Sequence, residues 1–268
     1  MRALLAAVAL ATRPAAAGPV AAPLDAVALV VVTPGMERPA FLPLVAALEC
    51  AGFDAWTVEI PPDAPLPPEG ADREVAVWIR AAAGALRAGG RPTALVGHGP
   101  GATLALMAAP GAADAVVALG PLLGPPDTAL SRFLAALPVP EDGVDLGAPL
   151  AWGRHDAATL LLGSPPPPLG RLPAPLARDG QRWLAEGPPL DPAAVTCPVY
   201  VAAAARDRFA PVESIRGPAD RFHRATFVRF GILRFDHRDP GSADLLSERA
   251  VLGAATRWLC RTLAGRTP

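Results

Sequence analysis

Residues 94–106 read ALVGHGPGATLAL and join a strand-like apolar run to a helix-like run of small residues through a glycine-rich turn. Tight strand-to-helix turns of this kind are where many α/β enzymes hold a nucleophile or bind a phosphate. Nucleophilic catalysis needs a hydroxyl, thiol or carboxylate in such a turn, and Gly99 at its centre has none of these. The sequence therefore predicts a turn of the type that carries a nucleophile, but the nucleophilic atom is missing.

The same turn also fits the dinucleotide-binding pattern G-x-G-x-x-A, with Gly97, Gly99 and Ala102 at the pattern positions. That pattern needs an acidic residue at the end of the following strand, whereas Asp114 stands at the start of that strand. A P-loop would need a lysine, and the sequence contains none. Dinucleotide binding is therefore the weakest alternative, and we expect no cofactor.

The segments around the turn alternate between strand and helix patterns, which predicts an α/β fold with a mostly parallel sheet and helices on both faces. In such sheets ligands bind at the carboxyl ends of the strands, so the turns that follow the strands should meet around one site. The predicted strands are 26–32, 53–60, 93–97, 114–120, 197–204 and 225–233, and the predicted helices are 41–52, 71–88, 100–109 and 243–263.

A proline-rich stretch interrupts this alternation between residues 121 and 192, with only short helical pieces such as 128–137. We interpret residues 121–192 as a cap inserted into one core, which comprises residues 26–120 and 193–268. Residues 1–25 are a possible signal peptide, ending near residue 17, or an N-terminal extension that forms part of the fold. The location of the protein, cytoplasmic or exported, depends on which of these holds.

Composition excludes several classes of function. The net charge of −1 provides no field that favours nucleic acid or an anionic membrane surface. The three cysteines and four histidines are scattered without metal-ligand spacing, so we expect no metal site. No apolar run is long enough for a transmembrane helix.

Four sequence motifs occur in the order found in the α/β-hydrolase fold: VVTPGMERPAFLPLVAAL, VGHGPGA, YVAAAARDRFAPVES and FGILRFDHRDP. Over residues 26–263 the chain resembles this esterase- and lipase-like family. The resemblance implies that the second motif is the nucleophile elbow G-x-S-x-G, formed here by Gly97, His98, Gly99, Pro100 and Gly101. It further implies that the acid is Asp207, that the base is His237, and that the oxyanion-hole positions are Pro100 and the first loop, Pro34 to Met36.

The chain departs from the family at the two positions that do the chemistry. Gly99 occupies the nucleophile position, and Pro100 has no backbone N–H to donate to an oxyanion. Loss of one such donor typically costs roughly 10²–10³-fold in rate. Glycine relieves the backbone strain of an elbow, and proline suits the first turn of a helix, so both residues fit a turn that is kept for its shape.

Two functional hypotheses follow from this departure. The first is a non-catalytic hydrolase-like protein whose cap and strand ends bind a small apolar or acyl-type ligand, or a protein partner. The second is a weak ester hydrolase in which His237, oriented by Asp207, activates a water molecule. The alternative roles of these two residues are structural, with Asp207 capping a turn and His237 lining a pocket, while His98 packs beneath the elbow.

Overall fold

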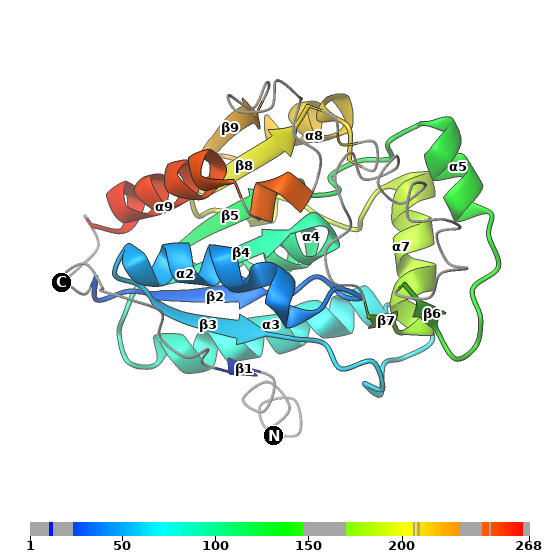
Figure 1. Cartoon of the computed structure of the whole chain (residues 1–268), viewed down its shortest axis with the longest axis horizontal. Coiled ribbons are helices and arrows are strands. Elements are labelled where there is room, and N and C mark those ends of the chain that lie inside the picture. Colours follow the sequence, from blue (N-terminus) through cyan, green and yellow to red (C-terminus); the bar gives the residue numbers. More distant parts are fainter. Residues whose placement is uncertain are drawn as a thin grey trace.

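The computed structural model describes residues 11–12, 24–146, 170–205, 207, 210–230, 243–246 and 248–264. Its centre is a seven-stranded sheet with the order β1-β3-β2-β4-β5-β8-β9 (Figure 1). Six of these strands run parallel, and β1 alone pairs antiparallel, with β3. The strands are β1 (Ala11–Thr12), β2 (Val27–Val31), β3 (Asp54–Val58), β4 (Thr93–His98), β5 (Ala115–Leu119), β8 (Val199–Ala204) and β9 (Ala225–Phe230).

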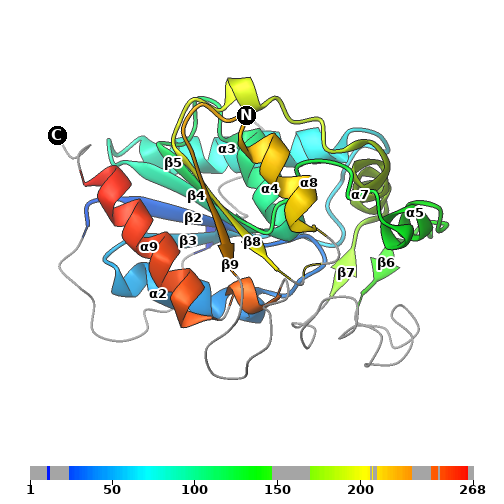
Figure 2. The same ribbon diagram turned by 90° about the horizontal axis from the view of Figure 1, so that it is seen from above.

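Helices cover both faces of the sheet, as the alternating pattern predicts (Figure 2). Side chains from α3, α4 and α8 pack on one face, and side chains from α2 and α9 pack on the other. Successive residues of β2 face opposite sides, with Leu29 in the first layer and Val30 in the second. The helices are α2 (Leu42–Cys50), α3 (Ala71–Arg87), α4 (Gly99–Ala108), α8 (Val212–Ala219) and α9 (Arg249–Leu263).

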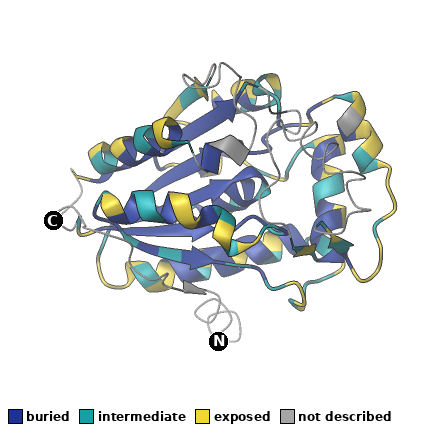
Figure 3. Cartoon of the chain, in the orientation of Figure 1, coloured by how far each residue is buried: buried dark blue, intermediate teal, exposed yellow. Residues whose placement is uncertain are grey.

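Burial on both faces explains why the central strands are continuous apolar runs. All five residues of β2 and of β5 are buried, and Figure 3 shows the inner strands dark blue along their length. The register aligns the carboxyl ends of the strands, with Val31 opposite Gly97, His98 opposite Leu119, and Leu119 opposite Ala202. The turns after β2, β4 and β8 therefore lie at one edge of the sheet, as expected.

The prediction of one continuous helix over residues 243–263 is wrong. It consists of a short 3-10 helix, η3 (Ala243–Leu246), and of α9, which begins at Arg249. Glu248 has an extended backbone, with φ −71° and ψ 121°, so the helical phase set by Leu246 does not continue. Ala250, which a continuous helix would bury beside Leu246, is exposed, and Val251 is buried instead.

The region between β5 and β8 contains more regular structure than its prolines suggest. Its described elements are α5 (Ala129–Ala135), β6 (Val144–Asp145), β7 (Arg171–Leu172), α7 (Ala174–Glu186) and the 3-10 helix η2 (Pro192–Ala194). The 13-residue α7 is longer than the short helical pieces predicted for this stretch, with Pro173 as its N-cap and Pro175 in its first turn. Proline is compatible with the start of a helix, where its missing N–H has no intrahelical partner. Residues 147–169 lie outside the described part of the chain.

Candidate active site at the β4–α4 elbow

The β4–α4 turn, which is predicted to be the nucleophile elbow, passes directly from an extended residue to a left-handed one. His98 is extended, with φ −129° and ψ 142°, and Gly99 follows in the left-handed region with φ +53°. Residues with side chains rarely adopt such a φ, and where they do the strain usually serves a function. A Cβ placed on Gly99 would meet no heavy atom within 4 Å, so the position has room for a side chain.

The two outer glycines are required by close contacts. A Cβ on Gly97 would lie 2.6 Å from the Cα of Ala102, and one on Gly101 would lie 2.9 Å from the carbonyl oxygen of Val31. Neither position can accept a larger residue unless the backbone moves. The absence of a side chain at Gly97 and Gly101 therefore allows strand β4, helix α4 and the end of β2 to approach closely, whereas no such contact limits position 99.

The loop after β2 is tied to the elbow by a hydrogen bond from the Thr33 hydroxyl to the carbonyl oxygen of His98. Within this loop the N–H of Met36 donates to the carbonyl oxygen of Thr33 at 2.9 Å. The Met36 amide is thus used inside its own turn. Pro100 is the second residue of α4 and has no N–H to donate.

His98 packs beneath the elbow. Its ring is buried and meets the ring of Phe41 edge-on, with 6.5 Å between the ring centres. Behind it, Thr103 of α4 is anchored to the loop after β5, since its hydroxyl donates to the carbonyl oxygen of Leu122 at 2.9 Å and accepts from the Leu122 N–H at 3.0 Å. These contacts fix the direction in which α4 leaves the sheet.

Asp207 lies just beyond β8, at the same edge of the sheet as the elbow. Asp207 is 4% exposed, and its Oδ1 accepts a hydrogen bond from the N–H of Ala210 at 2.9 Å. This bond is the turn-capping contact considered for Asp207 in its structural role. His237, the predicted base, lies outside the described residues, so the pairing of Asp207 with His237 stays a prediction.

An apolar cavity of about 360 Å³ opens beside the β4–α4 turn, between α4 and the helices α5 and α7. Pro100 and Leu104 line it from α4, with Pro34 nearby in the loop after β2. The opposite walls come from α5 and α7 and are formed mainly by leucines, prolines and Trp183. Pockets that bind small organic molecules are typically of this size and character, with few polar groups.

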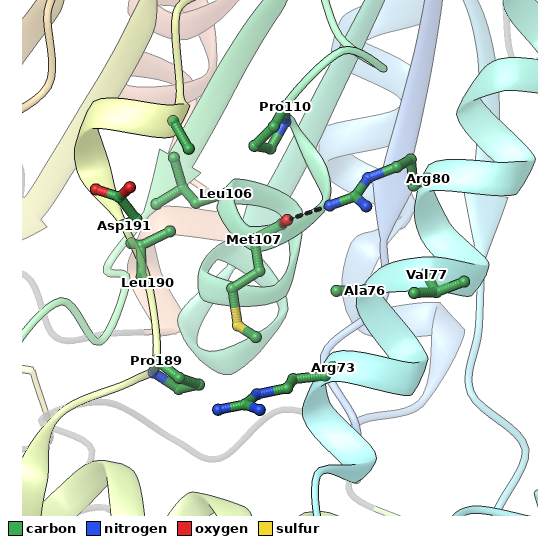
Figure 4. Close-up of a pocket in the computed structure, with 11 residues that line it drawn as sticks. Arg73, Ala76, Val77, Arg80, Leu106, Met107, Pro110, Pro189, Leu190 and Asp191 are labelled. Carbon is green, nitrogen blue, oxygen red and sulfur yellow. Dashed lines mark hydrogen bonds between the residues drawn. The ribbon is translucent and has the colours of Figure 1, made fainter.

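A second hollow, of about 390 Å³, lies between α3, α4 and residues 189–194 (Figure 4). Arg80 reaches across from α3 and donates to the carbonyl oxygen of Met107 at 3.0 Å and to that of Ala108 at 3.3 Å. Its guanidinium thus closes the carboxyl end of α4, where unpaired carbonyls attract cations. None of the elbow residues lines this hollow, so it is separate from the candidate site.

The acid considered for a dinucleotide site lies away from the glycine-rich turn. Asp114 lies at the amino end of β5, where its carboxylate pairs with Arg87 at 3.0 Å and accepts from the Thr93 N–H at 3.0 Å. It is therefore at the opposite edge of the sheet from the turn that would hold a dinucleotide. Among the described residues no three His, Cys, Asp or Glu side chains gather as metal ligands. No helix within that same part is long and apolar enough to cross a membrane.

Sequence reasoning missed a buried carboxylate pair beside the cavity. Asp72 in α3 and Asp179 in α7 are each 1% exposed, and the Asp72 N–H donates to Asp179 Oδ2 at 2.8 Å. Burial raises the pKa of Asp179 above its usual range, and repulsion from Asp72 adds to the rise, although hydrogen bonds from Asp72 and Arg182 oppose it. The two acids are 107 residues apart in the chain, so no local pattern indicated the pair.

No family model and no curated sequence matches the chain. Solved structures do match it. A monoacylglycerol lipase from Paleococcus ferrophilus is 19% identical with a TM-score of 0.59, covering 91% of this chain and 97% of that one. A thermophilic esterase from Thermogutta terrifontis is 17% identical with a TM-score of 0.63, covering 90% and 92%. A soluble variant of the monoglyceride lipase from Saccharomyces cerevisiae is 14% identical with a TM-score of 0.62, covering 93% and 90%.

Likeness at such low identity concerns the fold, and it extends over nearly the whole chain. The six parallel strands, the helices on both faces and the glycine-bounded turn after β4 agree with it. The chain therefore has the α/β-hydrolase fold of esterases and lipases.

Proposed function

We propose that this protein is an α/β-hydrolase-like binding protein that has lost acyl-transfer chemistry at its elbow. The observation that supports the proposal most directly is the glycine at position 99. Its backbone has the left-handed φ of +53° and there is space for a side chain, yet the residue is glycine. Without a nucleophile the covalent route is closed, and removal of a catalytic serine in a well-studied protease costs about 10⁶-fold in turnover.

The oxyanion hole is impaired as well. Pro100 lacks the N–H that the residue after the nucleophile contributes in this fold. Met36 uses its N–H within the turn to Thr33. Restoring a nucleophile alone would therefore leave the developing negative charge poorly stabilised, since each such donor is worth roughly 2.7–4 kcal/mol in transition-state energy.

The ligand we propose is a small apolar or acyl-type molecule, because the cavity that begins at Pro100 is lined almost entirely by apolar side chains. Burial of apolar surface contributes roughly 25 cal/mol per Å², so a ligand without charge can bind there by hydrophobic contact alone. Two of the solved neighbours are named as lipases of monoacylglycerol or monoglyceride, which are acyl-type molecules. Their names support an acyl-type ligand for a cavity in the same fold.

The test is an ester panel combined with a binding assay on the same purified protein. We expect no turnover of short or long acyl esters above background, and saturable binding of the uncharged dye Nile red. Leu104→Arg, which places a charge in the cavity wall, should weaken dye binding. Exposed Leu42→Arg on the opposite face of the sheet is the matched control and should leave binding unchanged.

Hydrolysis that disappears in His237→Ala would overturn this proposal in favour of the water-activating alternative, in which His237 and Asp207 act without a nucleophile. Absence of dye binding would overturn the ligand assignment while leaving the loss of chemistry in place.

A further inference from the structure

Helix α7, which forms one wall of the apolar cavity, has a glycine in the middle of its buried face. Gly180 lies one turn from four buried residues, with Leu176 and Ala177 before it and Trp183 and Leu184 after it. Residues three and four positions apart share one face of a helix, so Gly180 is at the centre of the face that these four form. Gly180 itself is only partly buried, and it lines the cavity together with all four. It therefore faces the cavity.

The usual structural reasons for a glycine inside a helix do not apply to Gly180. Glycine in a helix interior lowers stability relative to alanine, because its backbone loses more freedom on folding. The φ of Gly180 is not positive, so its backbone conformation does not require glycine. Close packing does not require it either, since a Cβ at this position would meet no heavy atom of the described chain within 4 Å. What the glycine provides is open space.

This space lies midway along the cavity. The lining residues of α7 extend from Leu176 to Leu184, which in an α-helix corresponds to a length of about 12 Å. Gly180 stands halfway between these two leucines, and Leu104 of α4 and Leu134 of α5 line other walls. A side chain at position 180 would project into the middle of the cavity and divide it. The glycine therefore keeps the cavity continuous along two turns of α7.

We propose that Gly180 determines how long an apolar chain the cavity can hold. The inference rests on the proposed function, since it requires that the cavity binds an apolar ligand. It also narrows the class of ligand to uncharged molecules with an unbranched hydrocarbon chain, because the cavity is elongated along α7 and its lining is mainly apolar. Each methylene that enters such a cavity adds to the affinity until the cavity is full. The space over Gly180 sets the chain length at which this happens.

The experiment is isothermal titration calorimetry on the full chain with straight-chain primary alcohols from hexanol to dodecanol, which are uncharged. For the wild type we expect the affinity to rise about fourfold with each added methylene, and to level off once the chain fills the cavity. Gly180→Leu should bind short alcohols with similar affinity and level off at a chain about three or four carbons shorter, because its side chain takes up the volume of about four carbons. Gly180→Ala should level off about one carbon earlier than the wild type.

Melting temperatures separate an effect on the cavity from an effect on folding. Gly180→Ala should raise Tm by about 2–4 °C, because alanine is the better helix former and meets no clash. The variant should thus be more stable and yet hold a shorter chain. Gly84→Leu is the matched control, since Gly84 lies exposed in helix α3, where a Cβ also meets nothing within 4 Å. It should retain the wild-type dependence on chain length.

The possible results distinguish this inference from the proposed function. The same chain-length limit in the wild type, Gly180→Ala and Gly180→Leu would overturn the role of Gly180 and leave the proposed function intact. A uniform loss of affinity at all chain lengths in Gly180→Leu, or a lower Tm in Gly180→Ala, would do the same. If Gly180→Leu does not fold, the limit measured for Gly180→Ala decides. Failure of every alcohol to bind the wild type would overturn the proposed ligand, and the role of Gly180 with it.

Discussion

Substitution of Gly99 by alanine or serine tests the geometry on which the account depends. The residue sits at φ +53°, where a side chain costs roughly 1–2 kcal/mol because the Cβ approaches the following carbonyl. No further cost is expected, since a Cβ at this position meets no heavy atom within 4 Å. We therefore expect Gly99→Ala and Gly99→Ser each to lower the free energy of unfolding by about 1–2 kcal/mol, with nearly equal values.

The assay is urea denaturation followed by circular dichroism, with Gly84→Ala as a control. Gly84 lies exposed in helix α3, where a Cβ also meets nothing within 4 Å and φ is not positive. That substitution should stabilise the protein by about 0.5–1 kcal/mol, because alanine is the better helix former. If Gly99→Ala proved as stabilising as Gly84→Ala, the left-handed elbow would be wrong.

Three further outcomes follow from named contacts. Gly97→Ala should lower the free energy of unfolding by at least about 2–3 kcal/mol in urea denaturation, more than Gly99→Ala does, because its Cβ would lie 2.6 Å from the backbone of α4. An equal or smaller loss would refute the close approach of β4 and α4. Thr103→Val should lower the free energy of unfolding by about 2–3 kcal/mol, since it leaves the buried N–H and carbonyl of Leu122 without the Thr103 hydroxyl. A change under about 0.5 kcal/mol would count against the importance of these two hydrogen bonds. Tyr200 is the one tyrosine of the chain, and burial raises its pKa to about 12, so native absorbance at 295 nm should titrate near pH 12 and unfolded absorbance near pH 10. The folded state holds the proton more tightly, so stability should fall as the pH rises from about 10 to 12, and coincident titrations would contradict the burial.

The sheet could be predicted because its strands are buried on both faces and so appear as apolar runs. The β2 strand at 27–31 and the β5 strand at 115–119 lie inside the predicted ranges. The role of the turn after β4 as a nucleophile elbow came from the family resemblance and stays a prediction. The need for glycine at position 97 is local, because a Cβ there would meet Gly101 and Ala102, whereas the need at position 101 comes from Val31 and Thr33, which only the fold brings near.

Features that depend on distant contacts could not be predicted. Helix α7 begins among prolines, and its stability comes from packing against α5 and α3 rather than from its first turn. The buried pair of Asp72 and Asp179 joins two helices that only the fold brings together. The hydrogen bond from the Met36 N–H to the carbonyl oxygen of Thr33 likewise depends on the backbone path of the loop, which the residue types do not determine.

The central claim is that the elbow keeps its shape and lacks its reactive atom, and intact-mass spectrometry with a fluorophosphonate tests it most directly. We expect no adduct on the wild type or on Gly99→Ala. Gly99→Ser should gain one phosphonyl adduct as its hydroxyl displaces fluoride, slowly because Pro100 offers no N–H, and faster by about 10²-fold or more when Pro100→Ala is added. An adduct on the wild-type chain, or a Gly99→Ser chain that stays unlabelled with and without Pro100→Ala, would contradict the account.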